Sequence, residues 1–315
     1  MPETKAVINT VLDDREGFHD MFEDSWTQKQ DAMHREFFDT WIQWTSDSIH
    51  FDTAQFPHAY PTGGASESLR EIIQQYGNDA RAGNFEPVIH VFESEYEGYQ
   101  AYADNAHVKV VTHKRENWRE AVETLGKNDL FFLSQPSAID GNVWEDYDIF
   151  MRMLDDKRPD AKVILDLTYV GGVKPALDIK ADYPNISHVV FSLSKPFGVY
   201  YHRIGGVFSR EEMGGLWGNM WFKNVGSLRF GTELMNAYKA GELPRKYAHV
   251  QEEAAARISK VLGVDLQVSD VFLVATAKMP DNPTEEQEYF RRGDLIRVCL
   301  TPMMDKILKQ ERTGP

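Results

Sequence analysis

Between residues 60 and 195 the sequence alternates short apolar runs with longer amphipathic segments. The apolar runs predict strands in the segments PVIHVFES, VKVVTH, DLFFLSQP, KVILDLTYV and HVVFSLSK. The segments between them predict helices in SLREIIQQYG, YEGYQAYADNA, RENWREAVETLG and WEDYDIFMRMLDDK. Strands that alternate with helices form a mainly parallel sheet with helices on both faces. The sequence therefore predicts an α/β fold with such a sheet.

Two further segments flank this alternating region. Residues 18–44 carry apolar side chains at helical spacing: Phe18, Phe22, Trp26, Met33, Phe37 and Trp41. We expect an amphipathic helix or helix pair that buries this face in the core or against a second subunit. After residue 232, a helical segment around Pro244 precedes the strand-like runs VSDVFLVATAKM and DLIRVCLTP, which predicts a smaller α+β lobe. We divide the chain into a large domain (46–230) and a small domain (1–45 with 231–315).

Charge, cysteine and histidine content exclude several classes of function. The net charge of -15 argues against nucleic acid and anionic membranes as partners, because both bind clustered lysine and arginine. No run approaches the ~18 apolar residues of a membrane span, and the N-terminus lacks a signal-peptide core, so we expect a cytoplasmic protein. The apolar run around Cys299, the single cysteine, predicts a buried, inert thiol. The scattered histidines lack ligand spacing, which predicts no metal site.

Polar residues gather where the predicted strands and turns end, and ligands bind at the carboxyl ends of parallel strands. The stretch GGASESLR places Gly63, Gly64, Ala65 and Ser66 at the start of a helix. Such a start offers free N–H groups and a helix dipole to a phosphate, although a plain turn with Ser66 as N-cap gives the same pattern.

Two other stretches supply charged groups at strand ends. The stretch VILDLTYVGG puts Asp166 inside an apolar strand, where it needs either a core arginine or a buried cationic ligand atom as partner. The stretch SLSKPFGVYYHRIGG supplies two serines and Arg203, which suit a phosphate, and Lys195. Lys195 is either an ordinary edge lysine or a nucleophile that forms an imine with an aldehyde.

A phosphate cradle, a carboxylate for a ring nitrogen, a phenol and a lysine together suit pyridoxal phosphate. The Asp of DLTY stands 29 positions before the Lys of SLSKPFGVYYHRIGG, an arrangement that resembles fold-type-I pyridoxal-phosphate enzymes of the class I/II aminotransferase family. The run KPFGVYYHRIGG is similar to the lysine loop of aspartate aminotransferases. The resemblance implies a sheet of the seven-stranded type and a small α+β lobe, here shortened.

The resemblance also implies a role for each site residue. Lys195 forms the imine with the cofactor, Asp166 pairs with the pyridine nitrogen, and Tyr169 bonds the ring oxygen. Tyr96 stacks on the ring, in a segment where Ser94 replaces the family's usual proline. Arg297, in the terminal strand-like run, holds the carboxylate of the substrate. The remaining residues form the phosphate site: Gly64, Ala65, Ser66, Ser192, Ser194 and Arg203.

One departure from the family concerns the ring oxygen. Ala138 stands where the family has an asparagine that contacts this oxygen. Either Gln135 or Ser137 substitutes for the asparagine, or the contact is absent. Its loss would alter the pKa of the imine and the choice of reaction.

The resemblance implies an aminotransferase that acts on amino acids and keto acids as a homodimer. A lyase, a decarboxylase or an oxidase would use the same residues, and a non-catalytic cofactor-binding protein is the alternative outside enzymes. Candidates for the substrate pocket, each equally compatible with a structural role, are His50, His58, Tyr60 and Arg229. We expect His202, beside Arg203, to be a loop residue rather than a catalyst.

Overall fold

The structure of the protein is a computed structural model. It describes residues 1–27, 31–221 and 224–313, and the side chains of residues 25–33 and 312–315 lie outside the description. The expected packing of Trp26 and Met33 therefore falls outside the described side chains.

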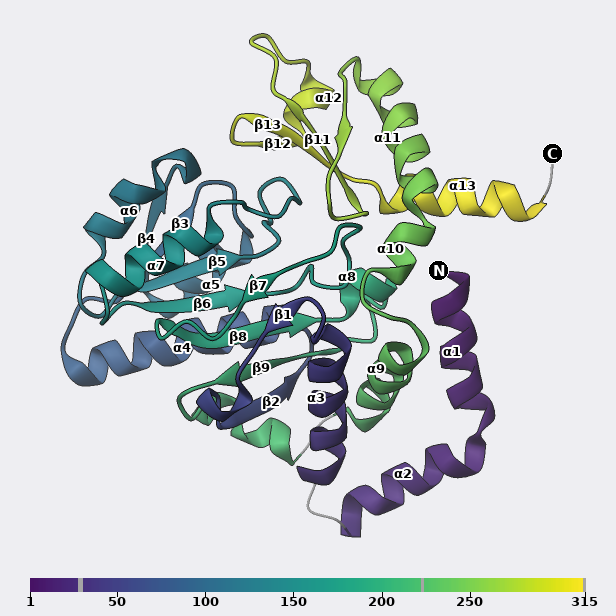
Figure 1. Ribbon diagram of the computed structural model, residues 1–315, viewed down its shortest axis with the longest axis horizontal. Coiled ribbons are helices and arrows are strands. Elements are labelled where there is room, and N and C mark those ends of the chain that lie inside the picture. Colours follow the sequence, from purple (N-terminus) through teal and green to yellow (C-terminus); the bar gives the residue numbers. More distant parts are fainter. Residues whose placement is uncertain (28–30, 222–223, 314–315) are drawn as a thin grey trace.

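A seven-stranded sheet forms the centre of the protein (Figure 1). Its strand order is β2-β9-β8-β6-β5-β3-β4, and the pairs from β8 to β4 are parallel. The strands are β2 (His58–Thr62), β3 (Val88–Phe92), β4 (Lys109–His113), β5 (Leu130–Ser134), β6 (Lys162–Asp166), β8 (Ile186–Ser192) and β9 (Gly205–Ser209). The α/β fold with a mainly parallel sheet is confirmed, because the apolar runs of the sequence form its parallel strands.

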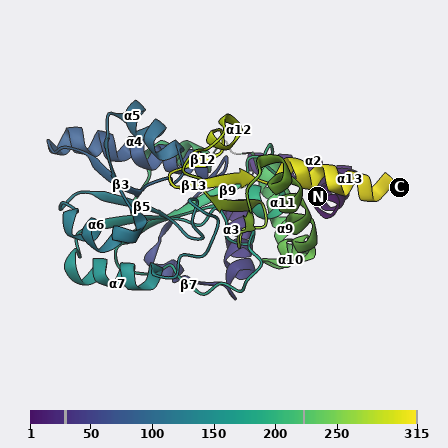
Figure 2. The ribbon, with the colours of Figure 1, turned by 90° about the horizontal axis from the view of Figure 1, so that it is seen from above.

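Helices cover both faces of this sheet, as Figure 2 shows. Alternation along β5 explains why: Leu130 and Phe132 point to one face, while Phe131 and Leu133 point to the other. The first face packs against α4 (Ala65–Gly83) and α5 (Gly98–Ala106). The second face packs against α3 (Asp31–Thr45), α6 (Trp118–Thr124) and α7 (Tyr147–Lys157).

Two strands at one edge of the sheet were not expected from the sequence. β9 pairs antiparallel with both β8 and β2, so that β2 becomes an edge strand. β2 contains Pro61, and β9 begins with Gly205 and Gly206. Proline and glycine weaken the pattern of a strand, and this concealed both elements in the sequence.

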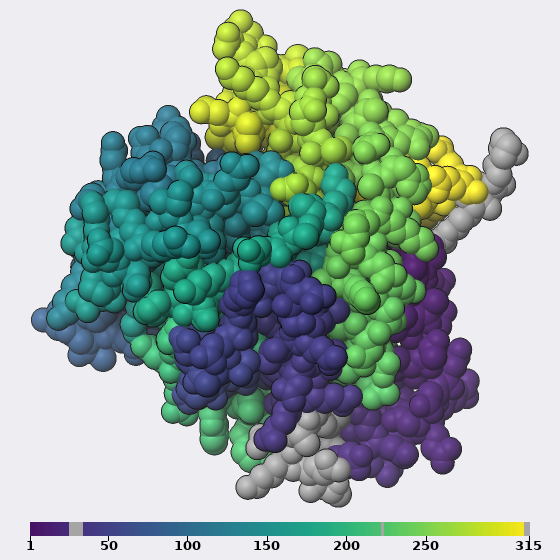
Figure 3. All heavy atoms as spheres, viewed as in Figure 1, coloured from purple at the N-terminus to yellow at the C-terminus, as the bar shows by residue number. Residues whose placement is uncertain are grey.

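The N-terminal segment forms the expected helix pair. α2 (Arg15–Thr27) precedes α3, and in α3 the rings of Phe37 and Trp41 are buried against Phe191 of β8. Phe22 of α2 stays 39% exposed. α1 (Pro2–Asp13) and α2 pack against α9 (Val225–Ala237), and Figure 3 shows these purple helices along one side of the molecule.

The C-terminal lobe is built around a four-stranded antiparallel sheet, at the top of Figure 1. Its elements are α10 (Glu242–Lys246), α11 (Ala248–Leu262), β10 (Gln267–Val268), β11 (Val274–Lys278), α12 (Glu285–Glu288), β12 (Arg291–Arg292), β13 (Leu295–Cys299) and α13 (Thr301–Thr313). The small α+β lobe is thus confirmed. The domain division stays a prediction, and α3 packs on the central sheet.

Short elements complete the chain and connect the larger ones. They are β1 (Ile49–His50), β7 (Ile179–Lys180), α8 (Ser194–Phe197) and the 3-10 helices Thr53–Gln55, Arg115–Asn117 and Gly214–Met220. No helix within the described residues has the length and apolar character needed to cross a membrane.

Candidate active site

A cavity of about 190 Å³ lies at the carboxyl ends of β5, β6 and β8. Every residue predicted for the cofactor lines it except Gly64, which borders it beside Arg203. The lining residues are Ala65, Ser66, Leu69, Tyr96, Ser134, Ala138, Asp166, Thr168, Tyr169, Ser192, Ser194, Lys195, Tyr200 and Arg203. Positions up to 138 residues apart in the sequence therefore meet at one place.

The N-terminus of α4 opens toward one end of this cavity. The helix begins at Ala65, its N-cap is Gly64, and no side chain caps it. The expectation that Ser66 is the N-cap is wrong, because its hydroxyl lies 3.3 Å from the hydroxyl of Tyr96. An uncapped N-terminus leaves N–H groups and the positive end of the helix dipole available to an anion.

Arg203 brings a second positive group to the same end. Its side chain donates to the carbonyl of Tyr200 at 3.0 Å, and it forms no ion pair within the described residues. Gly64 has a φ of +87°, and a Cβ atom at this position would lie 2.7 Å from an Nη atom of Arg203. Only glycine combines this backbone conformation with so close an approach.

Two serines complete the polar wall near Arg203. The Ser192 hydroxyl is 3.3 Å from the carbonyl of Ile204 and 3.2 Å from the amide of Ser194. The Ser194 hydroxyl is buried and has no hydrogen-bond partner among the residues that the structure describes. A buried hydroxyl without a partner costs free energy, so this atom indicates a missing ligand group.

Asp166 ends β6 as a buried carboxylate without a positively charged partner in contact. It accepts hydrogen bonds from the Tyr99 hydroxyl at 3.1 Å and from the Thr168 amide at 2.9 Å. Burial raises the pKa of Asp166, and these hydrogen bonds and Lys195 oppose the rise only in part. The core arginine considered as its partner is not found within the described residues, which leaves a cationic ligand atom as the alternative.

Lys195 lies in the first turn of α8, directly after β8. Its Nζ atom is 5.1 Å from the centre of the Tyr200 ring. Burial lowers the pKa of Lys195; Arg297 and Arg203 lower it further, against an opposing effect of Cys299 and Asp166. A lysine with a lowered pKa has more of its neutral, nucleophilic form at neutral pH.

Arg297, in β13 of the C-terminal lobe, is not among the residues that line the cavity but contacts one of them, Tyr169. Its Nη2 donates a 2.8 Å hydrogen bond to the hydroxyl of Tyr169, and its Nε is buried without a partner. Burial raises the pKa of Tyr169, and Arg297 opposes that rise. Arg297 therefore has a donor left for a further acceptor beside the cavity.

The wall around Ala138 differs from the sequence interpretation. The Gln135 side chain is bound to the backbone of Trp144, at 3.0 and 3.1 Å, and the Ser137 hydroxyl accepts from Arg115 at 3.0 Å. Neither residue lines the cavity, so neither replaces the family asparagine. The polar side chain on this wall is Ser134, whose hydroxyl accepts from the Ala138 amide at 2.6 Å.

Sequence reasoning also missed several residues that shape the site. Ser134 and Thr168 follow the rule that strand ends carry site residues, so this rule could have found them. Glu95 lies in the quoted segment ESEYEGY, but its neighbour Tyr96 carried the resemblance. No pattern in the sequence indicated Tyr99 or Tyr200.

Other expectations about side chains are corrected by the structure. Cys299 is exposed rather than buried, because Ile296 and Val298 take the inward positions of β13. None of the four candidates for the substrate pocket lines the cavity. His50 contacts Asp178, the Tyr60 hydroxyl accepts from the backbone amide of Met213, Arg229 pairs with Glu233, and the ring of His58 lies 6.4 Å from that of Tyr60.

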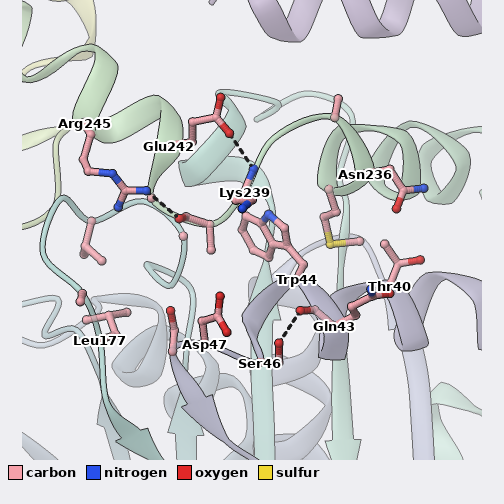
Figure 4. Close-up of a pocket in the computed structure, with 18 of the residues that line it drawn as sticks. Thr40, Gln43, Trp44, Ser46, Asp47, Leu177, Asn236, Lys239, Glu242 and Arg245 are labelled. Carbon is pink, nitrogen blue, oxygen red and sulfur yellow. Dashed lines mark hydrogen bonds between the residues drawn. The ribbon is translucent and has the colours of Figure 1, made fainter.

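A larger hollow of about 670 Å³ lies between α3, α10 and the loop after β6 (Figure 4). Trp44 forms one wall, and its indole donates to the carbonyl of Tyr238 at 2.7 Å. Lys239 lies beside Trp44, where its backbone amide donates to Glu242, and Arg245 lies farther from Trp44. A large volume alone does not indicate a functional site. The buried groups with shifted pKa values lie around Lys195 instead. No cluster of metal ligands occurs within the described residues.

Solved structures share this fold at low sequence identity. A pyridoxal-phosphate-bound C-S lyase from Staphylococcus hominis matches with a TM-score of 0.66 and 14% identity, over 87% of this chain and 81% of its own. The fold is that of fold-type-I pyridoxal-phosphate enzymes. An amino transferase from Eubacterium rectale matches with a TM-score of 0.64 and 15% identity, over 98% and 87% of the two chains.

An Escherichia coli protein with a methionine aminotransferase function matches with a TM-score of 0.61 and 13% identity, over 88% of this chain and 84% of its own. No protein-family model matches the sequence, and neither does any curated protein. The resemblance expected from the lysine loop is thus confirmed at the level of the fold.

Proposed function

We propose that the protein is a pyridoxal-phosphate-dependent aminotransferase that acts on an amino acid. The observation that carries the proposal is the cavity in which Lys195, with its lowered pKa, and the buried Asp166 meet an unpaired Arg203. The three groups fit the aldehyde, the ring nitrogen and the phosphate of one cofactor.

Two observations indicate that the end of the cavity near α4 suits the phosphate of the cofactor. The buried Ser194 hydroxyl has no partner, and the α4 N-terminus has no side-chain cap. A phosphate would accept from both, and Arg203 and Ser192 would supply the remaining donors. Ser66, in the first turn of α4, is the other hydroxyl on this wall.

The ring end fits the electrostatics of Asp166. A buried carboxylate with a raised pKa gains most from a cationic partner, and a protonated ring nitrogen is such a partner. Tyr169 lies beside it, and the Arg297 guanidinium orients the Tyr169 hydroxyl. Tyr96 supplies an aromatic wall of the cavity.

Pyridoxal phosphate supplies an aldehyde that bonds to amines and a ring that accepts electrons from the Cα of an amino acid. Lys195 lines the cavity and would hold the aldehyde of the cofactor through its Nζ atom. The Nζ atom of Lys195 could then carry the Cα proton as general base and acid, and its lowered pKa favours the neutral form that a base requires. Arg297 binds the substrate carboxylate and so aligns the Cα–H bond.

A C-S lyase among the similar structures makes elimination the second candidate. The cavity wall at Ala138 lacks the side-chain amide that the aminotransferase family resemblance implies, which favours a change of reaction. A decarboxylase or an oxidase would use the same Lys195 and Asp166. From the same resemblance we also propose that the protein forms a homodimer.

The test is incubation of the protein, loaded with pyridoxal phosphate, with single amino acids in the presence and absence of a 2-oxo acid. Transfer predicts that without acceptor at most one equivalent of 2-oxo acid per cofactor forms, whereas with acceptor the reaction continues and the acceptor becomes an amino acid in equal amount. Ammonia release without acceptor would show elimination instead. Lys195→Ala should lose either activity.

A further inference from the structure

Glu95 is a buried carboxyl group directly behind the cavity. It lies between β3 and α5, it is 6% exposed, and within the described residues it forms no ion pair with a lysine or arginine. Both its carboxylate oxygens lie 2.7 Å from the Ser134 hydroxyl oxygen, and the Tyr96 amide is 3.4 Å away. A buried carboxyl without a cation is costly, so its retention calls for a reason.

Ser134 connects Glu95 to the cavity. It lines the cavity beside Ala138, and its Oγ accepts a hydrogen bond from the Ala138 amide at 2.6 Å. A serine hydroxyl has one hydrogen to donate and two lone pairs to accept with. Ala138 uses one lone pair, so the single hydrogen and the second lone pair remain.

The protonation of Glu95 decides where that hydrogen goes. An ionised Glu95 can only accept, so it takes the hydrogen of Ser134 and leaves the cavity no donor. A protonated Glu95 donates its own hydrogen to the second lone pair of Ser134. The hydrogen of Ser134 is then free to point into the cavity.

The groups that face Glu95 favour the protonated form. The pKa of Glu95 is raised to about 7 in total: burial is the largest cause, Asp166 contributes to the rise, and the hydrogen bonds from Ser134 and the Tyr96 amide oppose it. The other facing groups are the phenols of Tyr99 and Tyr96, and Lys195 lies beyond Asp166. No positive charge contacts Glu95 directly within the described residues, so both protonation states are populated near neutral pH.

We propose that Glu95 is a positioning residue whose own proton determines whether Ser134 donates a hydrogen bond to the bound cofactor. The inference rests on the proposed function, because it needs a cofactor in the cavity. The Ser134 hydroxyl would then be the hydrogen-bond donor on the wall at Ala138 that Gln135 and Ser137 do not provide. The donor is present at lower pH and absent once Glu95 is ionised.

The test is a pH titration of the visible absorption band of the holoenzyme, in the wild type and in Glu95→Gln, Ser134→Ala and the double variant. We expect the band of the wild type to show an additional transition near pH 7, where Glu95 titrates. We also expect the midpoint pH of the band's own titration to differ by about one pH unit between the two states of Ser134. Glu95→Gln removes this transition, since glutamine does not titrate. Ser134→Ala removes it as well, although Glu95 is still present.

The double variant separates an effect through Ser134 from an effect of charge through space. We expect it to titrate like Ser134→Ala, so that Glu95→Gln changes nothing once the hydroxyl is gone. The inference would be overturned if the additional transition near pH 7 persisted in Ser134→Ala. It would also be overturned if that transition persisted in Glu95→Gln. If Glu95→Gln does not fold, Ser134→Ala alone decides. A wild type without any visible band overturns the proposed function itself, whereas an unchanged band in the variants overturns only this inference.

Discussion

The guanidinium of Arg297 donates a 2.8 Å hydrogen bond to the hydroxyl of Tyr169, across 128 positions of the sequence. The bond connects β13 of the C-terminal lobe to the loop after β6 of the central sheet. It places an arginine with an unused, buried Nε beside the cavity that Lys195 lines. The C-terminal lobe thereby contributes a charge to a site that is otherwise built by the central sheet.

Replacing Arg297 by glutamine should weaken substrate binding. Loss of a charged hydrogen bond to a carboxylate corresponds to an increase in KM of about 10- to 100-fold, with a smaller change in kcat. Steady-state kinetics with an amino acid substrate measure it. Arg291→Gln is the matched control, because Arg291 is on the surface in an ion pair with Glu288. An unchanged KM in Arg297→Gln would exclude its proposed role.

Replacing Asp166 by asparagine should lower kcat and leave the fold intact. Asparagine keeps the shape, its carbonyl oxygen can still accept from Thr168, and its NH2 group can donate to the Tyr99 hydroxyl, but it removes the charge that would hold a proton on the ring nitrogen. We expect kcat to fall by about 100-fold or more, at a retained visible cofactor band. A variant with wild-type kcat would show that Asp166 is a structural carboxylate only.

Gly64→Ala should weaken the binding of cofactor phosphate. The backbone conformation at φ +87° is unfavourable for alanine, and the new Cβ would lie 2.7 Å from Arg203 Nη2. Either Arg203 or the α4 N-terminus must shift, so we expect the Kd for pyridoxal phosphate to rise about tenfold or more. Titration of the visible band gives the Kd. Gly214→Ala is the control, since its Cβ would meet nothing within 4 Å.

Glu95 should make the stability of the cofactor-free protein fall as pH rises. Its pKa is raised from 4.5 to about 7 in the folded state, so the folded protein binds more protons than the unfolded chain between these values. The stabilisation is complete below pH 4.5 and is lost by about pH 7, and it amounts to about 3 kcal/mol. Denaturant unfolding of wild type and Glu95→Gln at both pH values measures the difference.

The two unfolding series should diverge in one direction. The free energy of unfolding of the wild type should fall relative to that of Glu95→Gln as the pH rises. Glu93 is an exposed neighbour, so Glu93→Gln should have the same pH dependence as the wild type. Parallel pH dependence in wild type and Glu95→Gln would contradict a raised pKa at Glu95.

The sequence predicted the fold and most of the site because both depend on local patterns. Apolar runs ending in polar residues mark buried parallel strands, and the carboxyl ends of such strands meet at one edge. Asp166 and Lys195 could be assigned from this rule, although 29 positions separate them. β9 could not, because Gly205 and Gly206 replace the branched residues that mark a strand.

The remaining errors concern which way a side chain points. Of the two roles considered for Ser66, that of helix cap is wrong, because α4 begins at Ala65 with Gly64 as its N-cap, and the Ser66 hydroxyl lies beside that of Tyr96. Cys299 was interpreted as buried because its run is apolar, whereas period-two alternation with Ile296 and Val298 turns it outward. The Glu95–Ser134 pair joins the connection after β3 to the end of β5, and no local pattern in the sequence indicates such a contact.

The most direct test of the central claim is to reduce the protein with borohydride after incubation with pyridoxal phosphate and to map the modified peptide by mass spectrometry. We expect one reduced pyridoxyl group per chain, attached to Lys195, and none on Lys195→Ala. The matched control is Lys239, in the larger hollow of Figure 4, which should remain unmodified. A label on any other lysine, or no stable label at all, would contradict the assignment of Lys195 as the residue that holds the cofactor.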